Sequence, residues 1–568
     1  MARFNLKKID YSSLGFVDSR WFYRILEIFP GFMTWGTIIA VVLFSIFNPI
    51  VIAYFIIAFD LLWLLKSIRM CWYQLRAYRN FKAAMKVKWA SRLDELNNLD
   101  TALAKNQSKY ERAPHASFLS FLSFNKDKVK RYFRNRDLHQ HVAELQLLDK
   151  RAQTLIKPSE IYHTVILATY NESIDILRPS IDALCEADYD LKKMIIVLAY
   201  EERGGEQTEK NAIQLEKEYR STFNDFIIVK HPADLPNELK TGKGPNITYA
   251  GKQFLKYSQE KGLDPKNVII TTLDADHRAD PQYFNYLTYA YVTDPNRRHK
   301  SFQPIPMFFN NIWDVPAPMR VIATGNSFWT MIEMVRPHRL RNFAAHAQSL
   351  ETLIDTDFWS VHTIVEDGHQ YWRTYFTYDG DHTVEPLFIP IYQDAVLSDT
   401  YRKTVVNQFK QLQRWAWGAS DFAFVVKNSI KNSRIPLGKK LVSIGRLFEG
   451  HYSWATAPII LTFVAWIPLL INQDFANLVV AHQLPVIASR ILTLAALGIF
   501  VTIWISIILL PPRPARYKRS KNIFMVLQWL LLPVTTLCFG SLAAINAQTR
   551  LMFGKYLEFR VTEKAVKK

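Results

Sequence analysis

Long apolar stretches lie near both ends of the chain, and a more polar region separates them. Between residues 31 and 65 the only charged side chain is Asp60, and Asn48-Pro49 interrupts this stretch near its middle. A helix of about 20 apolar residues crosses a hydrocarbon layer about 30 Å thick. The pattern therefore predicts a transmembrane hairpin over residues 31–67.

The C-terminal part of the chain contains three more apolar segments, at about 452–471, 485–511 and 522–552. They predict a group of transmembrane segments over residues 451–552. The last segment contains Pro533 and Gly540, which interrupt helices, so it either crosses the bilayer once or turns back. We favour the return, which leaves the basic tail 553–568 in the cytoplasm.

Basic residues set the expected orientation, because Lys and Arg gather on the cytoplasmic side of a membrane. Lys66 and Arg69 directly follow the hairpin, and the linker 512–519 is also strongly basic. We therefore expect an integral protein of a plasma or inner membrane with its central domain in the cytoplasm. Residues 1–30 mix aromatic and basic positions and suit an interfacial helix, and the polar residues 68–157 suit a cytoplasmic helical linker.

Short apolar runs alternate with helical patterns in the middle of the chain. The runs are His163–Thr169, Lys193–Leu198, Phe226–Val229 and Val268–Leu273. This alternation predicts an α/β domain over residues 158–400 with a Rossmann-like, mainly parallel sheet. Ligands bind outside the carboxyl ends of such strands, so the polar residues after each run are candidate site residues.

Two acidic residues, Asp274 and Asp276, follow the fourth run. Residues two apart in an extended chain share a face, and two carboxylates on one face repel unless a cation or a donor lies between them. Mg²⁺ or Mn²⁺, bridging to a substrate diphosphate, is the expected occupant. A turn or a capping position is the alternative for this pair.

The segment 240–246 is rich in glycine and basic residues and includes Lys243. It suits the delivery of backbone amides and an ammonium to a phosphate, and a plain surface loop is the alternative. Further on, Glu366 and Asp367 follow an apolar run, which suits a general base beside a hydroxyl nucleophile.

Gln411, Arg414 and Trp415 share one face of a predicted helix, at the spacing i, i+3 and i+4. An aromatic ring beside a guanidinium suits a sugar ring next to a diphosphate. The alternative is an ordinary amphipathic helix at the membrane surface, and residues 401–450 are expected to form such interface helices.

Composition narrows the class of protein. Of the 568 residues, 49% are hydrophobic and 21% are charged, which excludes a disordered or coiled-coil protein. The formal net charge is +19, but no nucleic-acid-binding motif accompanies it, so we expect a lipid bilayer and no nucleic acid as partner. The three cysteines form no CxxC pair and support neither a disulfide framework nor a zinc site.

The ordered set of motifs resembles the membrane-embedded glycosyltransferase family 2 enzymes, the group of cellulose, chitin and hyaluronan synthases. The motifs are Thr169-Tyr170-Asn171-Glu172, Asp274-Ala275-Asp276, Glu366-Asp367 and Gln411-x-x-Arg414-Trp415. The resemblance implies a GT-A fold, a nucleoside-diphosphate sugar donor (by family habit a UDP-sugar) and a divalent metal, Mg²⁺ or Mn²⁺. It also implies inverting transfer to a growing polysaccharide, with possible coupling to translocation of the product.

The resemblance also assigns roles to individual residues. Those that would bind the nucleotide sugar are Thr169, Tyr170, Glu172, Lys243 and Asp274, and Asp276 would bind the metal. Asp367 would be the catalytic base, with Glu366 beside it. Gln411, Arg414 and Trp415 would close over the diphosphate and the end of the acceptor.

Two segments depart from the family pattern. Where the family has paired aspartates after its second strand, this chain has Glu201-Glu202, and we assign Glu201 to the nucleotide-facing role. Where the synthases have a glycine-rich acceptor segment, this chain has residues 342–348, Asn-Phe-Ala-Ala-His-Ala-Gln. Two alternatives to a polysaccharide synthase therefore stay open: a non-processive transferase that adds one sugar to a lipid acceptor, and a catalytically silent membrane scaffold or transporter.

Overall fold

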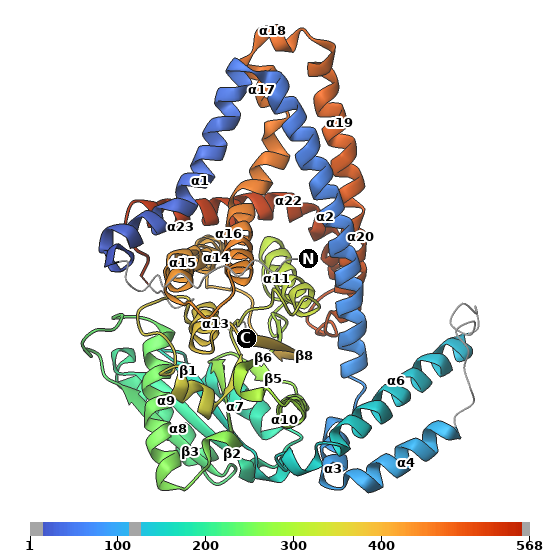
Figure 1. Ribbon diagram of the computed structural model, residues 1–568, viewed down its shortest axis with the longest axis vertical. Helices are drawn as coiled ribbons and strands as arrows, with labels where there is room; N and C mark the ends of the chain where they lie inside the picture. The colour runs from blue at the N-terminus through green and yellow to red at the C-terminus, as the bar shows by residue number, and fades with distance from the viewer. Residues whose placement is uncertain (1–14, 113–125, 559–568) are drawn as a thin grey trace, which may run out of the picture.

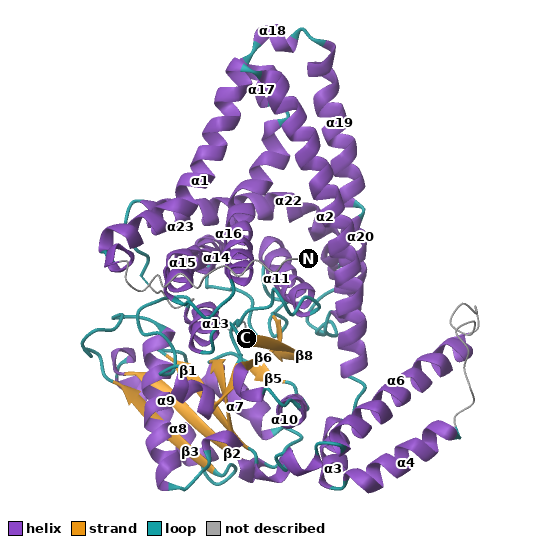
Figure 2. Cartoon of the chain, in the orientation of Figure 1, coloured by secondary structure: helices purple, strands orange, loops and turns teal. Residues whose placement is uncertain are grey.

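The computed structural model describes residues 15–112 and 126–558, so parts of the expected interfacial helix and of the basic tail lie outside the described residues. Figure 2 shows that the strands gather in a globular domain at one end of the molecule and that long helices form the other end. Shorter helices lie between these two parts (Figure 1).

The globular domain contains one eight-stranded sheet in the order β3-β2-β1-β4-β7-β6-β8-β5. Its strands are β1 (Tyr162–Thr169), β2 (Met194–Glu201), β3 (Asp225–His231), β4 (Val268–Asp274), β5 (Arg278–Ala279), β6 (Lys300–Met307), β7 (Ala347–Ser349) and β8 (Thr383–Tyr392). β1 pairs in parallel with β2 and β4, and β2 pairs in parallel with β3. The four strands expected from the apolar runs are thus confirmed.

The other half of the sheet corrects the expectation of a mainly parallel sheet. β7 is antiparallel to β4 and β6, β5 is antiparallel to β8, and β6 and β8 are parallel, so the sheet as a whole is mixed. β5 and β7 are short strands that the chain reaches through loops. Strands of two and three residues give no periodic signal, so the alternation of runs and helices does not reveal their direction.

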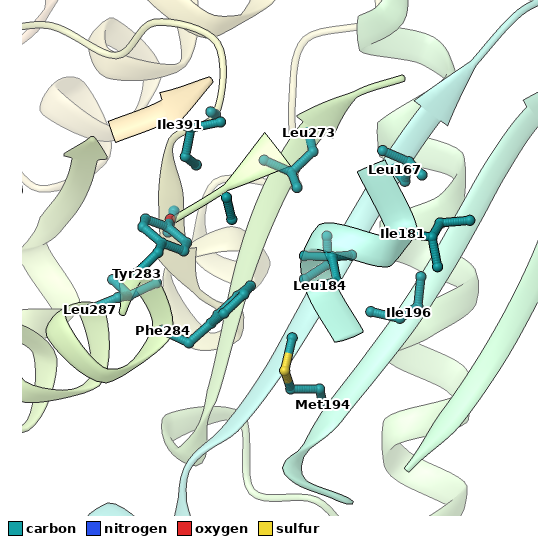
Figure 3. Packing of buried hydrophobic residues seen from close by; sticks show 14 of the residues in the cluster. Leu167, Ile181, Leu184, Met194, Ile196, Leu273, Tyr283, Phe284, Leu287 and Ile391 are labelled. Atoms are coloured by element: carbon teal, nitrogen blue, oxygen red, sulfur yellow. The ribbon is translucent and has the colours of Figure 1, made fainter. Parts of the chain in front are cut away.

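Helices cover both faces of the parallel half of the sheet, because successive side chains of a strand point to opposite faces. Val165 and Leu167 pack against α7 (Ile174–Cys185), α8 (Glu206–Tyr219) and α10 (Tyr283–Thr293), whereas Ile166 faces α9 (Lys243–Glu260) and α12 (Leu350–Asp355). Figure 3 shows the first of these cores, where Leu184 and Met194 pack near Phe284. Each strand of this half is therefore buried on both faces.

The intermediate helices are α11 (Ala317–Met334), α13 (Glu366–Thr377), α14 (Tyr401–Ala416), α15 (Asp421–Lys431) and α16 (Leu437–Ile459). One hydrophobic core runs through them from the sheet to the long helices. It contains Phe81 of α2 (Pro49–Ala84), Ile305 of β6, Ile505 of α20 (Gly498–Leu509) and Trp529. The sheet domain is therefore packed directly against the helical part.

Within residues 15–112 and 126–558, four helical segments are long and apolar enough to cross a membrane: Arg20–Phe47, Pro49–Ala84, Val479–Leu509 and Lys521–Met552. The first two are α1 and α2, which meet at Asn48, where the sequence predicts the turn of a hairpin. The third consists of α19 (Val479–Ala496) and α20. The expected segment 452–471 is not among the four; it forms the end of α16, a π-helical turn (Ile460–Val464) and α17 (Ile467–Ile471).

The top of the long helices is closed by α17 and α18 (Gln473–Ala476), which lie beside the turn between α1 and α2 (Figure 1). There the amide of Asn472 donates to the carbonyl of Ile46 at 2.9 Å. α16 and α17 therefore pack along α1, and α19 packs along α2.

The last apolar segment is divided into α21 (Lys521–Leu527), α22 (Leu532–Thr535), a π-helical turn (Thr536–Ser541) and α23 (Leu542–Met552). In Figure 1, α22 and α23 run crosswise to α1 and α2, between the long helices and the sheet domain. The guanidinium of Arg24 at the start of α1 donates to the carbonyl oxygens of Leu551 and Met552. The described end of the chain thus lies at the same end of the long helices as the sheet domain.

The connection from α2 to the sheet domain includes, among the described residues, α3 (Trp89–Asn97), α4 (Leu99–Glu111) and α6 (Lys126–Asp149). α4 and α6 pack side by side through Leu99, Ala102, Leu145 and Leu148. Figure 1 shows that this pair projects away from the rest of the molecule.

Candidate active site

The candidate site lies at the edge of the sheet where β1, β2 and β4 end. In the strand register Ala168 is opposite Asp274, and Thr169 is opposite Tyr200, which precedes Glu201. Three of the residues predicted from the sequence therefore leave the sheet at the same edge, although they are far apart along the chain.

The turn after β1 is held together by its own side chains. The Glu172 carboxylate accepts hydrogen bonds from the Thr169 hydroxyl at 2.7 Å and from the Tyr170 amide at 2.8 Å. The loop after β2 packs closely against this turn, since a Cβ on Gly204 would lie 1.9 Å from the Tyr170 carbonyl oxygen. Only glycine fits there, and the contact fixes one edge of the candidate nucleotide site.

Glu201 ends β2 and is 5% exposed. Its carboxylate lies 3.0 Å from Nδ1 of His231, at the end of β3, and 3.2 Å from the guanidinium of Arg203. The carboxylate thus ties the ends of β2 and β3 together. This internal role was not part of the expectation, which gave Glu201 a nucleotide-facing position.

Asp274, Asp276 and His277 form a group that could hold a metal ion. One ligand atom from each of them lies within 4.8 Å of the others. Asp274 is the last residue of β4, and Asp276 and His277 follow in a turn. The convergence therefore depends on this turn and not on the shared face of an extended strand that the sequence suggested.

The surroundings hold Asp276 in place. Its carboxylate accepts a hydrogen bond from the Asp394 amide at 2.8 Å, and its carbonyl accepts one from the Asn310 side chain at 3.0 Å. Two carboxylates with one imidazole suit Mg²⁺ or Mn²⁺, with the nitrogen ligand more typical of Mn²⁺. Sequence reasoning missed His277 as a ligand, although its position directly after the Asp-x-Asp motif was a signal.

Lys243 brings a positive charge to this group. It is the first residue of α9, and its ammonium lies 2.6 Å from a carboxylate oxygen of Asp274. Burial alone would lower the pKa of Lys243, but the carboxylates of Asp274, Asp367 and Glu366 raise it above its ordinary value. The lysine therefore stays charged, and it connects the Asp-x-Asp turn with the start of α13.

Glu366 and Asp367 are the first two residues of α13. Glu366 is 3% exposed, and one of its carboxylate oxygens has no hydrogen-bond partner among the described residues. Burial and the neighbouring charge of Asp367 raise the pKa of Glu366 to about 8, against the opposing effects of Lys243 and Arg414. Near neutral pH, Glu366 is therefore protonated.

Gly244 allows α9 to approach α13 closely. A Cβ at this position would lie 2.4 Å from the Ser360 carbonyl oxygen and 3.2 Å from Cβ of Glu366. The glycine-rich segment therefore allows close packing at Gly244 and provides the charge of Lys243. The alternative of a plain surface loop does not account for this packing.

The three residues of the predicted helical face lie at the end of α14 and face different neighbours. Arg414 is close enough to Glu366 to lower its pKa. The amide oxygen of Gln411 accepts a hydrogen bond from Gln408 at 3.1 Å, and the ring of Trp415 lies 6.2 Å from that of Phe308, just after β6. Of the three, Arg414 is the one that the structure joins electrostatically to the carboxylate pair.

The unusual segment 342–348 forms a buried wall next to this pair. Ala345 has a positive φ of 69°, a conformation that is rare for a residue other than glycine. His346 accepts a hydrogen bond from the Trp359 indole at 2.9 Å, and burial lowers its pKa to about 4, although the charge of Asp367 opposes this. The wall next to Asp367 thus contains a neutral imidazole.

Another imidazole–carboxylate pair lies one turn further along α13. Nδ1 of His369 is 2.7 Å from a carboxylate oxygen of Asp421, the first residue of α15, and Asp421 is 5% exposed. This pair connects the helix that carries Asp367 with the helix that follows α14. The sequence gave no signal for it, because 52 residues separate the two partners.

No protein-family model matches the chain, and no curated protein matches it either. Solved structures similar to the chain include the mannosyltransferase PcManGT from Pyrobaculum calidifontis in complex with GDP-Man and Mn²⁺, at 15% identity and a TM-score of 0.38, with 70% of this chain and 89% of that chain covered. Residues 1–349 of TarS from S. aureus in complex with UDP-GlcNAc are 14% identical at a TM-score of 0.34, with 70% and 94% covered. These similarities are distant, so the function of this chain has to be argued from its own residues.

Proposed function

We propose that the chain is an inverting membrane glycosyltransferase of family 2 that transfers a sugar from a nucleoside-diphosphate sugar to a growing polysaccharide. One observation carries the proposal: four segments far apart in the sequence bring opposite charges to one place. They are the turn after β4, the start of α9, the start of α13 and the end of α14. A group of acids and bases that come from separate segments and perturb one another is typical of an active site.

On the donor side, Thr169, Tyr170 and Glu172 would hold the base and ribose, with Glu201 fixing the neighbouring loop. Asp274, Asp276 and His277 would hold the divalent cation, and their oxygen-rich set with one nitrogen fits Mg²⁺ or Mn²⁺. When bound, the cation would neutralise charge on the diphosphate. Lys243, charged and next to Asp274, would add its ammonium to the same diphosphate.

Asp367 would be the catalytic base. Its carboxylate takes the proton from the acceptor hydroxyl while the oxygen forms a bond to the anomeric carbon. The bond from that carbon to the diphosphate breaks, and its electron pair leaves on the diphosphate oxygen. Attack on the face opposite the leaving group inverts the anomeric centre, and the positive charges of Lys243 and Arg414 stabilise the departing diphosphate.

The protonated state of Glu366 supports this division of roles. Two adjacent ionised carboxylates would repel each other in a buried site, so one of them holds a proton. Glu366 is the more buried of the two, and its raised pKa keeps it neutral near pH 7. Asp367 can then accept the proton of the acceptor, and neutral Glu366 can donate a hydrogen bond to a sugar hydroxyl.

The identity of the acceptor has an alternative within this proposal. A lipid that receives a single sugar would use the same donor site and the same base. A silent scaffold or transporter is disfavoured, because the buried, partly unpaired Glu366 and the charged Lys243 are costly to keep without a function.

Release of nucleoside diphosphate from a panel of nucleotide sugars tests the proposal, with the full chain in detergent and with Mn²⁺, Mg²⁺ or EDTA. We expect metal-dependent release from one donor, lost in Asp276→Asn and in Asp367→Asn but kept in Asp94→Asn, an exposed acid on α3. Binding of Mn²⁺ should fall in Asp276→Asn and stay normal in Asp367→Asn. A ladder of products identifies a polysaccharide, a single glycolipid identifies the alternative, and release that survives both variants would refute the proposed site.

A further inference from the structure

Six cationic side chains gather where the apolar stretch of α2 ends, and we call them the arginine cluster. They are Lys66 and Arg69 of α2, Arg336, Arg339 and Arg341 of the segment after α11, and Arg446 of α16. Burial lowers the pKa of Arg336, and the charges of Arg339 and Arg69 lower it further. Burial likewise lowers the pKa of Arg341, with further lowering by Arg446 and Arg339. The contacts of the three segments place the cations together: Glu449 of α16 is bonded to Lys66 and to Arg339, and Arg446 donates to the His338 carbonyl.

Two carboxylates lie within the arginine cluster. Glu333 is 2.7 Å from Arg336, and Glu449 bridges Arg339 at 2.8 Å and Lys66 at 2.9 Å. Burial alone would raise the pKa of Glu449, but the hydrogen bonds from Lys66 and Arg339 hold it at about 2. The short salt bridges of Glu333 and Glu449 are therefore formed with three of the six cations, Arg336, Arg339 and Lys66.

The other three cations form no salt bridge with an acid among the described residues. Within residues 15–112 and 126–558, no carboxylate lies within salt-bridge distance of Arg69, Arg341 or Arg446. Arg341 lies over the rings of Tyr371 and Trp372, at 4.0 and 4.8 Å, and Arg446 donates to the His338 carbonyl at 2.9 Å. Arg341 and Arg446 are partly removed from water, which is costly for an unpaired cation, and an anion would offset this cost. Arg69 is exposed, so its guanidinium is accessible to the same anion.

The surface around the arginine cluster is apolar. Leu65, Ile68 and Trp72 share one face of α2 with Arg69 and are 65%, 60% and 65% exposed. Leu441 and Val442 are exposed on α16. A tryptophan and an arginine at the end of an exposed apolar helical face are typical of the membrane–water boundary. A soluble anion would need the charges only, whereas this surface also offers contact area for hydrocarbon.

We infer that the arginine cluster is a binding site for the phosphate of an anionic membrane lipid, whose acyl chains lie along the exposed face of α2. The guanidinium groups of Arg69 and Arg446 contact the phosphate from two helices, because guanidinium geometry matches phosphate oxygens. Bound lipid thereby joins α2 to α16 and to the segment after α11. This site is separate from the proposed transferase site, and it does not depend on the transferase being active.

Native mass spectrometry of the full chain in a neutral detergent tests the inference, with phosphatidylglycerol and phosphatidylcholine as probes. We expect preferential retention of phosphatidylglycerol, reduced about tenfold or more in the double variant Arg69→Gln/Arg446→Gln, as the loss of two charges near an anionic headgroup implies. Lys518→Gln/Arg519→Gln removes two exposed charges from the basic linker and serves as the matched control with unchanged retention. Arg69→Lys/Arg446→Lys should keep most of the preference, because the charges remain.

Two results would overturn the inference. One is equal retention of phosphatidylglycerol by the wild type and the Arg69→Gln/Arg446→Gln variant, in preparations with matching thermal unfolding. The other is competition by inorganic phosphate at the same concentration as the lipid, which would assign the cluster to a soluble phosphate. Both variants change side chains that are not fully buried, so the fold is expected to persist.

Discussion

The ammonium of Lys243 lies 2.6 Å from a carboxylate oxygen of Asp274, so the first residue of α9 neutralises the last residue of β4. Asp367 and Glu366, at the start of α13, also raise the pKa of this lysine. A single side chain therefore stands between the candidate metal ligands and the candidate base. The order of these elements along the chain makes this contact possible only after the sheet and both helices have assembled.

Replacement of Lys243 tests this intermediate position. In Lys243→Gln we expect the rate of nucleoside diphosphate release to fall about a hundredfold, because a buried positive charge next to the leaving diphosphate is lost. Lys252→Gln is the matched control: it lies on the same helix and pairs with Asp357 at 2.8 Å on the surface, so its removal should leave the rate unchanged. Equal rates for wild type and Lys243→Gln would contradict the assignment.

Amide substitutions at the two adjacent acids of α13 should have different effects on the rate. Asp367→Asn is expected to lower the rate by about 10² to 10⁴, the usual contribution of a general base. Glu366→Gln should retain most of the activity at pH 7, because a protonated glutamic acid and a glutamine are similar in size and charge. Rates measured across pH 6 to 9 would distinguish the two, and a greater loss in Glu366→Gln would reverse the roles.

The raised pKa of Glu366 also predicts an effect on stability. An unfolded glutamate ionises near pH 4.5 but folded Glu366 ionises at about 8, so the folded state binds the extra proton between these values. Stability of the metal-free protein should therefore fall as pH rises through this window, and Glu366→Gln should lack this part of the fall. Thermal unfolding in EDTA at pH 5, 7 and 8.5 would measure the difference between the two proteins.

A buried histidine predicts that stability changes with pH in the opposite direction under acidic conditions. His163 of β1 is fully buried and bonds to Thr288 at 2.7 Å, and burial lowers its pKa to about 3. In the unfolded chain this histidine binds a proton below about pH 6.5, whereas in the folded chain it stays neutral. The free energy of unfolding therefore decreases as pH falls below that value, by about 1.4 kcal/mol per pH unit. His163→Gln should have a shallower acid slope than the wild type, whereas the exposed control His362→Gln should match the wild type.

Two glycines near the site should differ in their tolerance of a methyl group. In Gly244→Ala the new Cβ would meet the Ser360 carbonyl at 2.4 Å, so α9 must move away from α13 and the alignment of Lys243 with Glu366 is lost. Gly368, two residues after Glu366, has open space around its Cβ position, and Gly368→Ala should be neutral. Activity and thermal unfolding of both variants would show this contrast, and equal activity in the two would argue against close packing of α9 on α13.

The sequence predicted the parts of the fold that a single local pattern determines. Apolar runs marked β1 to β4, and the polar residues after them marked the edge of the sheet at which the site lies. The mixed half of the sheet was not predictable, because β5 and β7 consist of two and three residues and leave no periodic signal. Their direction is decided by tertiary pairing, which strand propensity does not encode.

Within the site, individual residues were easier to predict than their partners. The motifs marked Asp274, Asp276 and Asp367 as candidates, but the pairing of Lys243 with Asp274 depends on how α9 meets β4. The same holds for His369 and Asp421, which are joined across two helices. Contacts of this kind depend on the packing of whole elements, and no short motif contains both partners.

The support of α14 by α23 has a consequence for the timing of synthesis. Leu412 of α14 packs against Ala543, and Gln413 donates to Asn546, a residue 133 positions further along the chain. The ribosome therefore completes the sheet, the candidate base Asp367 and the helix that carries Arg414 long before the supporting helix α23 emerges. A nascent chain that has not yet released α23 would hold Arg414 loosely, so the activity proposed for this site would begin only on chains whose last long helices are already made.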